Sequence, residues 1–269
     1  MALNAIFGAI FGDIVGSPYE VNNTKEYNFR LLSHRSGYTD DSILTIATAD
    51  WLVNGGCVAS YYDVYGNKYK GGVGGYGKGF NAWLEKAEKE PYGAESNGSA
   101  MRVSPVGCFF KTLEETLEVA KTTAACTHNG DGGIEGAQFV AAAIFLIRQG
   151  MTKEDVKEQL SKMFSYDLNM KYDEVKKDYG WSYGVSNKGT VPYAFIAFFE
   201  SNSFEDAIRK AVSLGGDSDT IGAICGSMAG AYYGIPDKFI KEVYNRVPKE
   251  FIDVLSQFMA KSATEIQKK

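Results

Sequence analysis

The sequence predicts an all-α protein that folds as a single domain over residues 1–269. Apolar residues recur with the 3.6-residue period of a helix in several segments, and no segment sustains the two-residue alternation of a half-buried strand. The chain has 269 residues, of which 45% are hydrophobic and 23% charged. These values are typical of a globular protein that buries one full core.

Several helices are predicted by their capping residues. A hydroxyl side chain followed three positions later by an acid marks a helix start, since the two can satisfy free N–H groups of the first turn. This pairing occurs three times, at Thr112 with Glu115, Thr152 with Asp155 and Ser203 with Asp206. We expect helices over the periodic segments 113–125, 134–149, 192–200, 204–213 and 248–264.

Two further helices are predicted to carry a stripe of glycines. Glycine stands at every fourth position in two segments, at Gly8, Gly12 and Gly16 and again at Gly222, Gly226, Gly230 and Gly234. Residues four apart lie on one face of a helix. Each glycine inside a helix costs about 1 kcal/mol relative to alanine. We therefore expect both helices at the centre of the fold, where close backbone contact offsets that cost.

Two segments lack a clear period. Residues 54–98 are rich in Gly, Tyr and Asn, and we expect binding loops there with a short helix over 82–89. Within it, residues 72–77 match G-x-G-x-x-G, but no βαβ unit surrounds them, so a dinucleotide site is not expected. Residues 166–188 are polar, and we expect a surface helix followed by a loop.

Composition excludes several classes of function. The net charge is −5, from 28 basic and 33 acidic residues, so general nucleic-acid binding is not expected. The uncharged stretch 220–236 is short for a bilayer span, and nothing basic precedes the apolar residues near the N-terminus. The four cysteines are widely spaced and are interpreted as buried thiols of a reducing compartment. We expect a cytoplasmic monomer that does not associate with membranes.

Two acidic turns stand directly before helices. The first, 38–42 (YTDDS), can be explained as a capped helix whose acids complement the helix dipole. The second, 215–220 (GGDSDT), supplies two carboxylates and two hydroxyls, more than a cap needs. Hard oxygen ligands at a tight turn are typical of Mg²⁺, Mn²⁺ or Ca²⁺ sites. Four carboxylates brought together without a basic partner would repel unless divalent cations neutralised them, so a two-metal site is predicted.

The motifs, taken in order, resemble the ADP-ribosylglycohydrolase family. The resemblance spans roughly residues 5–236 and is carried by five segments: 8–20 (GAIFGDIVGSPYE), 38–42, 97–105 (NGSAMRVSP), 127–129 (THN) and 215–220. It implies a compact orthogonal helical bundle with a dimetal site at helix N-termini. The implied enzyme is a metal-dependent hydrolase that cleaves ADP-ribose from a modified protein or small-molecule acceptor, with ADP-ribosyl-arginine as our first expectation.

The resemblance also implies roles for individual residues. The implied metal ligands, for two Mg²⁺ or alternatively Mn²⁺, are Thr39, Asp40, Asp41, Asp217, Asp219 and Thr220. Glu20 and Asp41 are the implied catalytic residues. The implied substrate contacts are Tyr76, Gly77, Asn97, Gly98, Ser99, Met101, His128, Gly216 and Ser218.

Some residues near these motifs keep two interpretations. Asp13 either supports the metal ligands or forms an ordinary hydrogen bond at a helix end. Arg102 either faces a phosphate or forms a structural salt bridge. The chain also departs from the family pattern, since Ser42 replaces a common Thr, Ser96 replaces a Gly, and Gly130 and Asp131 follow the 127–129 motif.

Two other classes of function remain open from the sequence. A non-catalytic member of the family could bind ADP-ribose or act structurally, although every implied ligand is present in this chain. A different dimetal hydrolase, such as a phosphoesterase, would use the same kind of acidic turns.

Overall fold

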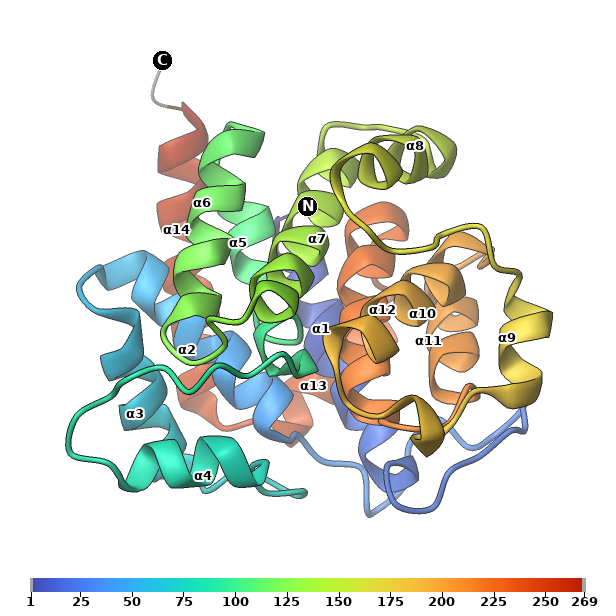
Figure 1. Ribbon diagram of the computed structural model, residues 1–269, viewed down its shortest axis with the longest axis horizontal. Coiled ribbons are helices and arrows are strands. Elements are labelled where there is room, and N and C mark those ends of the chain that lie inside the picture. The colour runs from blue at the N-terminus through green and yellow to red at the C-terminus, as the bar shows by residue number, and fades with distance from the viewer. Residues whose placement is uncertain (1, 268–269) are drawn as a thin grey trace.

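The computed structural model describes residues 2–267, and within them it contains 14 α-helices and no β-strand (Figure 1). Two isolated antiparallel β-bridges occur in these residues, one between Thr39 and Gly72 and one between Ser96 and Ser186. The predicted all-α class is confirmed.

Helices α1 (Ala2–Gly16) and α12 (Ser218–Tyr233) lie at the centre of the molecule (Figure 1). Gly8 and Gly12 face Gly226 and Gly222, whereas Gly16 packs on Ser218 and Asp219, and Gly234 lies just past the end of α12. A Cβ atom on Gly12 would lie 2.0 Å from the carbonyl oxygen of Gly222, far inside van der Waals contact. Only glycine allows the two backbones to approach this closely, which places the N-terminus of α12 beside the end of α1.

The remaining helices surround this pair. On one side lie α2 (Asp40–Asn54), α3 (Val58–Tyr69), α4 (Lys78–Glu85) and α14 (Lys249–Gln267). On the other lie α9 (Tyr172–Asp178), α10 (Asn187–Phe199) and α11 (Phe204–Val212), and α7 (Asp131–Arg148) lies between the two groups. The other helices are α5 (Ser104–Phe109), α6 (Leu113–Ala125), α8 (Lys153–Met163) and α13 (Asp237–Arg246), and short 3₁₀ turns are η1 (Ser17–Tyr19), η2 (Asn97–Ser99) and η3 (Trp181–Tyr183).

The predicted caps are present. The side chains of Thr112, Thr152 and Ser203 each accept a hydrogen bond from the N–H three residues later, and Thr39 accepts one from the N–H of Asp41. Each hydroxyl satisfies a donor that the helix itself leaves free. The helix starts were thus encoded locally.

One prediction about segment 54–98 was wrong. Helix α3 spans Val58–Tyr69 inside the region expected to form loops, and the short helix expected over 82–89 is α4, Lys78–Glu85. The buried side chains of α3 include Val58, Tyr62 and Tyr65, which follow the i, i+4, i+7 spacing. Tyrosines supply this apolar face, so its period was hidden in an apparently polar composition.

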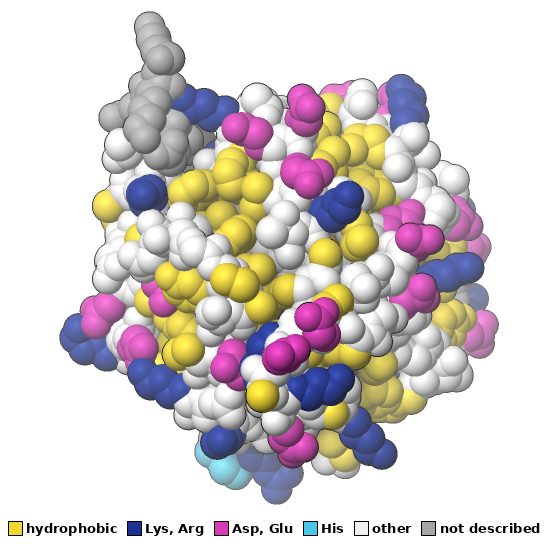
Figure 2. Space-filling view, turned by 60° about the vertical axis from the view of Figure 1, so that its left-hand side comes forward, with side chains coloured by type: hydrophobic (Ala, Val, Ile, Leu, Met, Phe, Trp, Pro, Cys, Tyr) yellow, Lys and Arg dark blue, Asp and Glu magenta, His cyan; other side chains and the backbone are white. Residues whose placement is uncertain are grey.

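The distribution of charged side chains on the surface is that of an ordinary globular protein. On the face shown in Figure 2, basic and acidic side chains are intermixed rather than separated by sign. No helix within residues 2–267 has the length and apolar character of a membrane span. The expectation that all four cysteines are buried was wrong, because Cys57 is exposed and Cys126 only partly buried.

Candidate active site

The first acidic turn is fixed by a carboxylate from the central helix. Asp13, in the last turn of α1, accepts hydrogen bonds from the backbone N–H of Thr39 at 3.0 Å and of Ser42 at 3.1 Å. It also accepts from the hydroxyls of both residues. Asp13 therefore supports the turn that begins α2, and the alternative of a simple helix-end hydrogen bond is wrong.

The second acidic turn meets the first at the start of α12. Gly215 and Gly216 adopt φ values of 79° and 69°, which side chains with a Cβ rarely tolerate. This backbone turns sharply into α12, whose first residues are buried. The hydroxyl of Thr220 donates to Oδ2 of Asp41 at 3.2 Å, across 179 residues of sequence.

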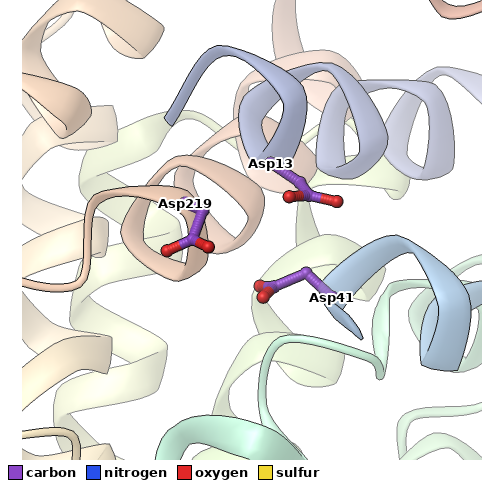
Figure 3. Close-up of side chains that lie close together, drawn as sticks. All are labelled: Asp13, Asp41 and Asp219. Atoms are coloured by element: carbon purple, nitrogen blue, oxygen red, sulfur yellow. The ribbon is translucent and has the colours of Figure 1, made fainter. Parts of the chain in front are cut away.

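Two overlapping groups of carboxylates result. In the first, oxygens of Asp13, Asp41 and Asp219 all lie within 4.8 Å of one another (Figure 3). In the second, oxygens of Glu20, Asp217 and Asp219 do so. Asp219 belongs to both, so the two groups form one continuous acidic cluster.

Burial favours the protonated form of several of these acids, and at some of them repulsion from neighbouring carboxylates adds to it. Burial raises the pKa of Asp13 to about 6. Burial, followed by the charges of neighbouring carboxylates, raises the pKa values of Asp40, Asp41 and Asp219 well above the ordinary value. None of the ion pairs found among residues 2–267 involves a member of the cluster.

The cluster fits divalent cations. Oδ1 of Asp41 is buried and has no hydrogen-bond partner in the described part of the chain. A buried carboxylate oxygen without a donor is costly. Mg²⁺ and Mn²⁺ prefer such oxygen ligands, and their positive charge would remove the repulsion that raises these pKa values.

The acidic cluster forms part of the wall of a cavity of about 480 Å³. Five of its acidic lining residues form the acidic set, Glu20, Asp40, Asp41, Asp217 and Asp219, and a sixth, Glu95, lies in another wall. Other walls come from Gly75 and residues 77–80, from residues 92, 94–98 and 101–102, from His128 and from Trp181 and Val185. The cavity has the size expected for a small-molecule ligand.

Comparison with known proteins decides the family. The model of the ADP-ribosylglycohydrolase family matches residues 1–268. The chain belongs to this family.

Proteins from animals, bacteria and archaea are similar in sequence to this family member. ADP-ribosylhydrolase ARH3 of Mus musculus is 25% identical, over 85% of this chain and 82% of that protein. ADP-ribosylarginine hydrolase Tri1 of Pseudomonas putida is 26% identical, over 90% of this chain and 74% of that protein. An uncharacterized protein of Archaeoglobus fulgidus is 32% identical over 61% of this chain, and the match spans 57% of that protein.

The fold of the family member is also found in a solved structure. A chain of an ADP-ribosylglycohydrolase-related protein complex superposes with a TM-score of 0.71 and 22% identity, covering 97% of this chain and 99% of that chain. This likeness confirms the helical architecture.

The implied substrate residues of this family member divide into two groups. Those that line the cavity are Gly77, Asn97, Gly98, Met101 and His128. Asn97 also donates to Oδ2 of Asp217 at 2.7 Å, so it joins the 97–105 segment to the acidic cluster.

The other implied substrate residues do not line the cavity and lie behind its wall. These are Tyr76, Ser99, Gly216 and Ser218. Ser99 is buried and donates to the carbonyl oxygen of Gly133 at 2.7 Å, while the buried Tyr76 hydroxyl has no partner among residues 2–267. Of the implied metal ligands, Thr39 also lies outside the lining. Its hydroxyl donates a hydrogen bond to Asp13.

Asn23 is a residue that the sequence analysis missed. Its side-chain oxygen accepts from the N–H of Gly216 at 2.7 Å, and its amide nitrogen donates to the carbonyl oxygens of Gly216, Tyr19 and Glu20. Asn23 therefore connects the Glu20 segment to the second acidic turn. No local pattern marks it, because its partner lies 193 residues away.

Proposed function

We propose that the chain is a metal-dependent hydrolase that cleaves the N- or O-glycosidic bond between ADP-ribose and an acceptor, and so reverses ADP-ribosylation. Family membership supports ADP-ribose hydrolysis as the reaction class. The observation that carries the metal-dependent reaction is the buried acidic cluster, in which Asp41 keeps an oxygen free of any partner within residues 2–267.

The acidic cluster would hold two Mg²⁺ ions, or Mn²⁺ in their place. The residues that offer oxygens are Asp13, Glu20, Asp40, Asp41, Asp217, Asp219 and Thr220. Such ions lower the pKa of bound water and polarise hydroxyl groups. Thr39 acts differently in this proposal, since its hydroxyl holds Asp13 and caps α2.

Glu20 is the proposed catalytic acid or base. It is half-buried at the end of η1 and lines the cavity. Burial, and then the charges of Asp217 and Asp13, raise the pKa of Glu20. A carboxylate with a raised pKa takes a proton from water more readily, as attack on the anomeric carbon requires. The transition state of such a reaction has oxocarbenium character.

The proposed acceptor is the guanidinium of arginine on a protein. Tri1, an ADP-ribosylarginine hydrolase by name, matches 90% of this chain. ARH3 relatives match with similar identity, so other linkages are the comparison to make. We further propose a cytoplasmic monomer, without general nucleic-acid binding.

The test is release of free ADP-ribose. Purified protein is incubated with arginine-ADP-ribosylated and serine-ADP-ribosylated peptides, with Mg²⁺ or with EDTA, and ADP-ribose is quantified by mass spectrometry. We expect Mg²⁺-dependent release from the arginine peptide. Release from the serine peptide alone would contradict the proposed acceptor but keep the reaction.

The two rival functions give different results in the same assay. A binding-only protein would bind ADP-ribose, measured by calorimetry, without releasing it from either peptide. A phosphoesterase would release phosphate from a chromogenic phosphomonoester but no ADP-ribose. Either result would reject the proposed hydrolase.

A further inference from the structure

Four side chains beside the acidic cluster form a hydrogen-bond relay that ends at the cavity. Nη2 of Arg102 donates to Oγ1 of Thr127 at 2.7 Å. Oγ1 of Thr127 lies 2.8 Å from Nδ1 of His128, and Nε2 of His128 lies 2.8 Å from Oγ of Ser96. Arg102 and Thr127 are fully buried and His128 nearly so, whereas Ser96 lines the cavity and is partly exposed.

The direction of each hydrogen bond follows from Arg102. A guanidinium can only donate, so Oγ1 of Thr127 must accept from it. Thr127 then has one proton to donate, and two acceptors are near. Nδ1 of His128 is 2.8 Å away, while the carbonyl oxygen of Ala124 is 3.4 Å away, which is long for a hydroxyl donor. Thr127 therefore donates to Nδ1.

This assignment fixes the tautomer of His128. An imidazole that accepts at Nδ1 is neutral only if Nε2 carries the proton. Burial, and then the positive charge of Arg102, hold the pKa of His128 well below its ordinary value, so the neutral form prevails. Nε2–H must then donate to Oγ of Ser96, which leaves the hydroxyl proton of Ser96 available.

We propose that Ser96 determines specificity by donating its hydroxyl proton to an oxygen of the bound ADP-ribosyl group, and that the relay holds it as a donor. The inference rests on the proposed function for the identity of the ligand. The hydroxyl of Ser96 has no other hydrogen-bond partner among residues 2–267. Its proton can therefore point into the cavity that Ser96 lines.

The environment selects an electron-rich oxygen. Arg102 also lines the cavity, and it forms no ion pair with a carboxylate in the described residues. Its Nε and Nη1 atoms are buried without partners there, and its guanidinium stacks on the ring of Tyr62, 4.2 Å away. A fixed donor in a cavity that this cation also lines favours a phosphate oxygen or a ribose hydroxyl oxygen of the ligand.

The first test measures the tautomer itself. The chain has two histidines, so a His34→Gln variant leaves His128 as the single imidazole for ¹⁵N NMR. We expect the ligand-free protein to show unprotonated Nδ1 and protonated Nε2 at neutral pH. A proton on Nδ1 would make Ser96 the donor to His128 and would overturn the proposal, whatever the reaction of the enzyme.

The second test measures ADP-ribose binding by calorimetry in Mg²⁺. Ser96→Ala removes the donor, and we expect affinity to fall by about tenfold or more, the effect of one hydrogen bond to a charged or strongly polar acceptor. Thr127→Val keeps the side-chain shape but removes the relay, so we expect a loss there too. The double variant should bind no more weakly than Ser96→Ala, because both changes remove one donor.

The matched control is Thr123→Val. Thr123 is also fully buried, and its hydroxyl bonds to the carbonyl oxygen of Ala120 outside the relay. The carbonyl oxygen of Thr123 accepts from Nη2 of Arg102, and the valine variant keeps this backbone contact, so affinity should stay unchanged. Unchanged affinity in Ser96→Ala would overturn the proposal even if Thr127→Val failed to fold. Wild-type protein that neither binds nor releases ADP-ribose would contradict the proposed function instead, and the tautomer would still decide the relay.

Binding of ADP identifies the acceptor oxygen. ADP has both phosphates but lacks the second ribose. Equal losses for ADP and ADP-ribose in Ser96→Ala would assign the acceptor to a phosphate, and a loss confined to ADP-ribose would assign it to the second ribose. No loss with either ligand would overturn the proposal.

Discussion

The cavity has two sets of polar lining residues that differ in what partners their polar groups have. The acidic set, Glu20 with four aspartates, has no cationic partner in the described residues, so its charge is left for ions from solution to neutralise. The relay set of Ser96, His128 and Arg102, with Thr127 behind it, is connected by hydrogen bonds within the chain. The acidic set should depend on metal, and the relay set should not.

The largest effect is expected from removing one carboxylate of the acidic set. Asp217→Asn should reduce ADP-ribose release to the level seen in EDTA, because one ligand of the proposed metal site is lost. Circular dichroism should show unchanged helicity, and titration with Mn²⁺ should show weaker binding. Ser96→Ala serves as the matched control and should keep its Mn²⁺ affinity. Full activity in Asp217→Asn would remove this residue from the metal site.

A smaller effect is expected at Glu20. Glu20→Gln keeps the size of the side chain but cannot take a proton, so kcat should fall by about 10² to 10⁴-fold, the usual contribution of a placed acid or base. ADP-ribose affinity should change little. An unchanged kcat would assign proton transfer to another residue.

A still smaller effect is expected at Asn23. Asn23→Ala removes the hydrogen bonds that connect the Glu20 segment to Gly216. Since Asn23 is exposed and each such hydrogen bond contributes about 1 kcal/mol, kcat should fall roughly tenfold. The neighbouring Asn22→Ala is the control, because Asn22 is also exposed. Equal kcat in both variants would show that the connection does not position Glu20.

The smallest and most selective effect is expected in the pH dependence of the free energy of unfolding. The pKa of Asp13 is raised to about 6, so the stability it contributes at low pH is lost as pH rises through that value. The lowered pKa of buried His128 acts oppositely, since stability is gained as pH rises through the ordinary histidine value of 6.5. The contributions of Asp13 and His128 to stability therefore change in opposite directions as pH rises.

Thermal unfolding with and without Mg²⁺ separates these two contributions. Mg²⁺ binds ionised carboxylates, so the increase in Tm on adding Mg²⁺ should grow between about pH 5 and about pH 7. The metal-free His128→Gln variant, which lacks the opposing group, should lose stability over the same range. A Mg²⁺ effect that does not change with pH would show that the acidic set does not bind the ion.

Much of the fold could be predicted because its signals are local. A hydroxyl cap such as Thr112 acts within three residues, and the glycines of α1 are readable at their four-residue spacing. Helix α3 was missed because tyrosines form its buried face. The acidic turns were found for the same local reason, since each contains several oxygen ligands beside a helix start.

The sequence by itself determined most of the helices, the two glycine stripes and the two acidic turns, because the signals for these features lie within one or two turns of chain. Tertiary structure decided which groups meet. Asp13 reaches a turn 26 residues away, and Asn23 reaches one 193 residues away. It also decided whether the hydroxyl hydrogen of Ser96 is free in the proposed relay, since that depends on a buried cation and the order of donors behind it. Hydrogen bonds act over about 3 Å and in one direction, and only the folded chain brings their donors and acceptors within that distance.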